Sequence, residues 1–175
     1  MSIEWERRLA NLWTTVDDCD EGTFVAKMER LVAELPPDSA IGAFERAGAF
    51  DSTGQSDRAV PLYRVALARG LADDRRRQAT IQLASSLRNV GQAAESVALL
   101  RAERDLASNA LDDAVSAFLA LALVDIGRER EAVSVALGAL APHLVRYRRS
   151  LDRYARLLAA EPDAGPSDGA EPEPR

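Results

Sequence analysis

The chain has 175 residues, of which 47% are hydrophobic and 29% charged, so it can bury one sizeable core. Its net charge of −6 argues against a nucleic-acid-binding domain, which normally presents a basic face. One cysteine, Cys19, excludes an internal disulfide. No apolar run approaches the ~18 residues of a membrane span, and the first residues lack a signal-peptide pattern. We therefore expect a cytoplasmic protein with no nucleic-acid and no membrane partner.

Ala, the best intrinsic helix former, is the commonest residue, and no alternating apolar–polar stretch is long enough to indicate a strand. The sequence therefore predicts an all-α protein. Two apolar stripes with helical spacing come first, and they consist of Trp5, Leu9, Leu12, Trp13 and Val16, then Phe24, Met28, Leu31, Val32 and Leu35. Thr23 is a candidate cap of the second helix, and Pro36-Pro37 ends it. Asp38 or Ser39 then caps a third helix.

Three glycines mark a repeat along the middle of the chain. Gly54, Gly91 and Gly127 each follow a helical stretch and precede another, at spacings of 37 and 36 residues. A small residue lies seven before each Gly, an apolar one four before, a small one five after and an apolar one nine after. These positions are Ala47, Phe50, Ala59 and Tyr63; Ala84, Leu87, Ser96 and Leu100; and Ala120, Leu123, Ala132 and Ala136. Small residues let helices approach closely, so each segment predicts a helical hairpin that stacks on the next.

This pattern resembles the tetratricopeptide repeat, whose signature places Ala-x-x-x-Phe after a small residue followed by an aromatic. Ala47-x-x-Phe50 and Ala59-x-x-x-Tyr63 carry the resemblance most closely, and the two later segments repeat it in looser form. It covers about residues 39–144. The resemblance implies an α-solenoid, a right-handed superhelical stack of antiparallel helix hairpins, and a function in binding a protein or peptide.

The segment from Leu35 to Leu158 is also similar to a small bacterial tetratricopeptide family whose members are thought to dimerise. This second resemblance implies a homodimer.

The last helix is predicted to start near Pro142, because proline suits a first helical turn. Its apolar stripe comprises Leu144, Tyr147, Leu151, Tyr154, Ala155 and Leu158, and four arginines lie opposite: Arg146, Arg149, Arg153 and Arg156. We expect this capping helix to end the stack. Residues 161–175 are rich in Pro, Gly and acid, which predicts disorder. The expected organisation is one domain over 1–160, comprising N-terminal helices (1–37), three degenerate repeats (39–141) and the capping helix (142–160).

The residues that carry catalytic chemistry are scarce. His143 is the only histidine, and one His with one Cys cannot build an ordinary four-ligand zinc site. The acid pairs Asp73-Asp74 and Asp112-Asp113 fall where a repeat's first helix begins, so we expect them to cap helices rather than bind metal. Arg75-Arg76-Arg77 is interpreted as the solvated side of a helix, with an acidic partner as the alternative. We predict no catalytic residue, no metal, no cofactor and no enzyme.

In the resembled fold, the first helix of each hairpin lines a concave face where partners bind. The expected binding residues are Ile41, Phe44, Gly48 and Asp51; Gln78, Ile81, Ser85, Arg88 and Asn89; and Ala114, Ala117, Phe118, Leu121 and Asp125. Arg88 with Asn89 is the one pair suited to a carboxylate. Residues 115–124 are apolar nearly all round, so the capping helix, the N-terminal helix or a second subunit must cover them.

These observations favour a protein-binding scaffold or adaptor that self-associates. The alternatives are a small-ligand receptor or enzyme that uses the concave groove, and a regulatory subunit of a larger complex.

Overall fold

The structure is a computed structural model that describes residues 2–106 and 110–160, and every regular element within these residues is a helix. The α-helices are α1 (Ile3–Trp13), α2 (Glu21–Val32), α3 (Ala40–Ser52), α4 (Ser56–Ala68), α5 (Asp73–Asn89), α6 (Ala93–Arg104), α7 (Asp112–Asp125), α8 (Glu129–Leu140) and α9 (Arg148–Ala160). Two single-turn 3-10 helices are η1 (Val16–Asp18) and η2 (Ala141–His143). The all-α prediction is confirmed. The tail predicted to be disordered, 161–175, lies outside the described residues.

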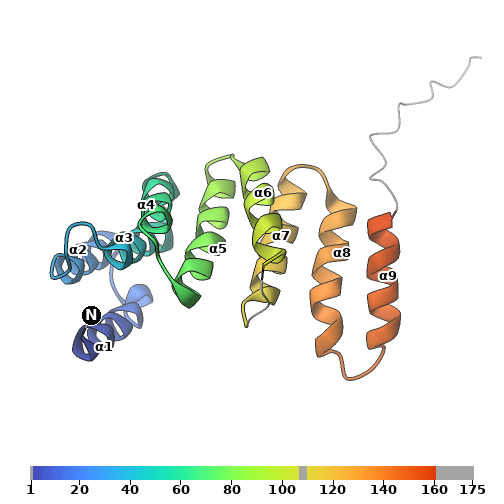
Figure 1. The fold of residues 1–175 in the computed structure, drawn as a ribbon, viewed down its shortest axis with the longest axis horizontal. Helices are drawn as coiled ribbons and strands as arrows, with labels where there is room; N and C mark the ends of the chain where they lie inside the picture. The colour runs from blue at the N-terminus through green and yellow to red at the C-terminus, as the bar shows by residue number, and fades with distance from the viewer. Residues whose placement is uncertain (1, 107–109, 161–175) are drawn as a thin grey trace, which may run out of the picture.

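The helices follow one another along the long axis of the molecule as antiparallel hairpins (Figure 1). The pairs α3–α4, α5–α6 and α7–α8 form the three hairpins, and α9 packs on α8. α5 also contacts both α3 and α7, so the first helices of the hairpins lie side by side and share one face. α1 and α2 lie at the end of the stack opposite α9 (Figure 1). This arrangement confirms the stacked hairpins expected from the repeat.

The repeated glycines end the first helix of each hairpin in the same way. Gly54, Gly91 and Gly127 have φ angles of 73°, 78° and 73°, which lie in the left-handed region that favours glycine. At Gly54, the N–H of the following Gln55 donates to the carbonyl oxygen of Phe50 at 2.9 Å, and the Gly54 N–H donates to that of Asp51 at 3.0 Å. These two bonds form a Schellman motif, which satisfies carbonyl groups at a helix end. The glycine phasing is therefore correct.

The small and large positions of the repeat build the core between hairpins. The small residues are buried, and they are Ala47, Ala59, Ala84, Ser96, Ala120 and Ala132. The larger positions Phe50, Tyr63, Leu87, Leu100 and Leu123 are buried beside them. The exception is Ala136, which is exposed on α8 although α9 packs on that helix.

The cap predicted for the second helix was wrong. Asp20, not Thr23, caps α2, since its Oδ1 accepts the Thr23 backbone N–H at 2.9 Å. The residues just before α5 and α7 are Ala72 and Leu111, whose side chains do not cap these helices. Asp112 and Asp113 lie in the first turn of α7, where their negative charge complements the helix dipole.

The last helix begins at Arg148 rather than near Pro142, which lies in η2. Tyr147 adopts a left-handed φ of 67° just before α9, so neither Leu144 nor Tyr147 belongs to its stripe. α9 instead docks through Ala155, whose carbonyl oxygen accepts a hydrogen bond from the Ser134 hydroxyl at 2.7 Å. Ser39 does cap α3, as one of the two residues expected there, through the Gly42 N–H.

Candidate functional site

The first-repeat part of the predicted concave face is covered by α1. Phe44 is buried and Ile41 half-buried on α3, and the Trp13 indole lies against Gly48. The indole Nε1–H donates to Glu45 Oε2 at 2.9 Å. The N-terminal helix therefore covers the first repeat, whereas the sequence had left it as a candidate cover of the third.

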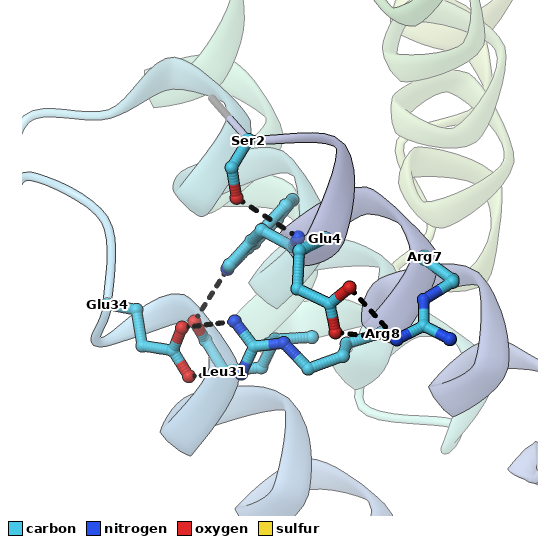
Figure 2. Close-up of polar contacts among 7 residues, drawn as sticks. Ser2, Glu4, Arg7, Arg8, Leu31 and Glu34 are labelled. Atoms are coloured by element: carbon cyan, nitrogen blue, oxygen red, sulfur yellow. Dashed lines mark hydrogen bonds and ion pairs between the residues drawn. The ribbon is translucent and has the colours of Figure 1, made fainter.

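α1 is held in this position from two sides. On the α2 side, Trp5 Nε1–H donates to the Leu31 carbonyl oxygen at 3.0 Å, and Arg8 pairs with Glu34 at 2.5 Å (Figure 2). On the α5 side, Glu6 pairs with Arg75 at 2.6 Å. The helix therefore bridges α2 and the concave face.

Asp51 serves as a polar link between the first two hairpins. Its Oδ1 accepts hydrogen bonds from the Ser86 hydroxyl at 2.7 Å and from the Ser56 hydroxyl at 3.2 Å. Asn89 Nδ2 donates in turn to Ser56 Oγ at 3.1 Å. This network couples α3, α4 and α5. Sequence reasoning missed Ser86 because one buried serine in a helix gives no signal of its partner.

The second-repeat residues divide between packing and exposure. Ile81 is buried, Ser85 is half-buried and Gln78 is exposed. Arg88 Nε lies 2.5 Å from Asp125 Oδ2 of α7, while Asn89 faces Ser56 of α4. The structure thus does not bring Arg88 and Asn89 together on one carboxylate position. Instead, Arg88 pairs with Asp125, and the sequence had predicted these two residues as binding positions of different repeats.

The third-repeat part of the face is the open one. α7 buries one side in the core but leaves Leu121 47% and Val124 49% exposed. Ala117 is exposed beside them and Phe118 is half-buried. We call Ala117, Phe118, Leu121 and Val124 the α7 patch. Among the described residues neither α1, on the first repeat, nor α9, on α8, covers it. Val124 was not predicted, although it lies at helical spacing from Ala117 and Leu121.

The arginine run at the start of α5 is not a solvated face, which corrects the sequence interpretation. Arg75 pairs with Glu6, and Arg76 makes two bonds to Glu103, at 2.6 and 2.8 Å. Arg77 is buried, with Nε 3.3 Å from Glu103 Oε1 and Nη2 2.7 Å from Asp112 Oδ1. The run therefore ties α5 to α1, α6 and α7.

The other chemically active residues are dispersed. His143 is exposed, with Nε2 2.8 Å from Asp113 Oδ2, and Cys19 is half-buried with its thiol directed at the Thr15 carbonyl oxygen. No group of three His, Cys, Asp or Glu residues is placed to hold a metal ion within the part of the chain that the structure describes. No described helix is long and apolar enough to cross a membrane.

A sequence model of the tetratricopeptide repeat family matches residues 40–158, which is well over half of the chain. The chain belongs to the tetratricopeptide repeat family. The tetratricopeptide repeat match begins with α3 and extends into α9, so α1 and α2 precede it. Neither the curated proteins nor the solved structures yielded a match.

Proposed function

We propose that this tetratricopeptide repeat protein is a non-catalytic scaffold or adaptor that binds a segment of a partner protein on the concave face of α5 and α7. Proteins of the family are generally non-catalytic scaffolds, which supports the first part. The observation that carries the second part is the α7 patch, whose Leu121 and Val124 are about half exposed side by side. Contiguous apolar side chains rimmed by polar ones are typical of an interface.

The rim of the patch indicates the chemistry of the partner segment. The Arg88–Asp125 pair lies at one edge, and Ser85 of α5 offers a neutral hydrogen-bonding group. A segment with two or three apolar side chains and little net charge fits this surface. We assign this protein to the cytoplasm. Disulfides are rare in that compartment, and a chain with one cysteine forms no internal disulfide.

A matched pair of variants tests the proposal. Val124 in the patch and Val133 on α8 are 49% and 46% exposed, so Val124→Asp and Val133→Asp introduce the same charge at nearly equal exposure. We expect affinity capture from the host cell to recover a protein with the wild type and with Val133→Asp, and to lose it with Val124→Asp. Recovery of the same proteins with all three would refute binding at the patch.

A second candidate is self-association through the same patch, which its apolar character and the twofold symmetry of most soluble oligomers favour. Sedimentation equilibrium at micromolar concentration tests it. We expect a doubled mass for the wild type and Val133→Asp, and the monomer mass for Val124→Asp. A wild-type mass near 18.9 kDa would refute it.

A further inference from the structure

The surface of α3 that faces α1 is shaped for an indole side chain. A Cβ at Gly48 would lie 3.1 Å from both Cη2 and Cζ2 of Trp13, tighter than ordinary contact, so glycine gives the ring its space. Beside it, the Glu45 carboxylate is only 4% exposed and accepts the Trp13 Nε1–H. A buried carboxylate is costly unless it is hydrogen-bonded, and here an indole from outside the repeats supplies the bond. Glycine and carboxylate together form a subsite that recognises tryptophan by shape and by its N–H.

A second subsite lies on α5. Arg75 pairs with Glu6 at 2.6 Å and lies 3.8 Å from Glu45, so it presents a cation at the edge of the groove. Glu6 and Trp13 are seven residues apart, which places them two turns apart on one face of α1. α1 therefore meets α3 and α5 as a docked amphipathic helix, with a carboxylate for Arg75 and an indole for Gly48 and Glu45.

The fit of α1 is incomplete. A cavity of about 350 Å³ remains between α1, α3 and α5, and its lining includes Ala10 of α1, Phe44 of α3 and Gln78 of α5. The Glu6–Arg75 pair is about one third exposed on each side, and pairs of this kind contribute little. Trp13 is only half-buried. Ala10 lines this cavity, so a larger apolar side chain at that position of a docked helix would fill more of it.

We propose that this face of α3 and α5 is a docking site for a partner's amphipathic helix carrying a tryptophan and, two turns before it, a carboxylate. α1 occupies the site until such a helix displaces it. The proposal rests on the proposed function and extends the binding face from α5 and α7 to α3. α1 and α2 are connected by a segment that contains η1. Displacement of α1 exposes Trp5 and Leu9, which are buried in the core with α2.

The test uses a fluorescein-labelled synthetic peptide of residues 2–14 with Ala10→Leu, titrated with the full chain and followed by fluorescence anisotropy. Leu9→Ala/Trp13→Ala weakens the resident helix and opens the site, so we expect this variant to bind the peptide about tenfold or more tighter than wild type. Adding Gly48→Leu fills the indole subsite and abolishes the gain. A control peptide that also carries Trp13→Ala and Glu6→Gln does not bind.

The proposal is overturned if Leu9→Ala/Trp13→Ala binds no tighter than wild type, or if Gly48→Leu leaves the gain intact. Circular dichroism checks that each variant stays helical. If Leu9→Ala/Trp13→Ala loses its helical signal, Trp13→Ala alone takes its place, and the same two outcomes then overturn the proposal. A doubled wild-type mass that Trp13→Ala abolishes would assign the site to α1 of a second copy and also overturn the partner assignment. Val124→Asp leaves peptide binding unchanged, so this test and that of the α7 patch fail independently.

Discussion

Glu103→Ala tests whether the second hairpin is held by a buried ion-pair network. Glu103 of α6 is buried and receives two bonds from Arg76 and one contact from Arg77, which also reaches Asp112 of α7. Removing one partner of a buried pair costs about 3–5 kcal/mol, because the remaining charge is left buried. Arg76 is 38% exposed and Arg77 keeps Asp112, so we expect the lower end, about 3 kcal/mol. For a chain of this length that corresponds to a fall in Tm of about 6–12 °C.

Glu95→Ala is the matched control, since Glu95 lies on the same helix and pairs with Arg64 at 2.7 Å. Both side chains of that pair are about half exposed, so its loss costs less than about 1 kcal/mol. Urea unfolding followed by the helical circular dichroism signal measures both variants. A loss of stability in Glu103→Ala no larger than that in Glu95→Ala would refute the buried network.

Three further outcomes follow from single positions. Ala47→Leu, at a fully buried contact, should cost about 1–3 kcal/mol of unfolding free energy, while Ala68→Leu on the exposed side of α4 should be near neutral; equal urea midpoints would contradict this. Burial raises the pKa of Glu45 in the folded state. As pH rises from the unfolded-state pKa through this raised folded-state pKa, the wild type therefore loses stability relative to Glu45→Gln. The loss is at most about 1.4 kcal/mol per pH unit. Urea midpoints measured from about pH 4 to 8 should therefore match at the acid end and favour the Glu45→Gln variant at neutral pH, and a constant difference would be evidence against the buried charge. Gly91→Ala should lower the free energy of unfolding by about 1–2 kcal/mol, because φ at Gly91 is 78°. Gly138→Ala, inside α8, should raise it by up to about 1 kcal/mol, because alanine favours the helix and meets no neighbour there. Thermal melts that shift in the same direction for both variants would disprove the distinction.

The sequence alone determined the helical class and the phase of the hairpins. Both depend on local physics: an apolar stripe recurs with the helical period, and Gly54, Gly91 and Gly127 lie where a helix end needs a left-handed residue. Burial of small residues such as Ala47 and Ala84 followed from the same phase, because positions aligned on the glycines repeat the same packing. The family resemblance rested on these positions, and the family match over residues 40–158 bears it out.

The tertiary structure decided which exposed-looking residues were already engaged. Arg77 looks solvated within its run, yet it is buried because Glu103 and Asp112 approach from two later helices. Arg88 meets Asp125, 37 residues on, and Trp13 meets Glu45, 32 residues on. Tyr147 takes a left-handed turn that no proline or glycine rule indicated, and this delays α9 to Arg148. Pairings of this kind depend on how the hairpins stack and on where α1 docks. Helical periodicity within one segment shows which side of a helix is apolar. It does not show which other helix covers that side, so the sequence pattern could not predict these contacts.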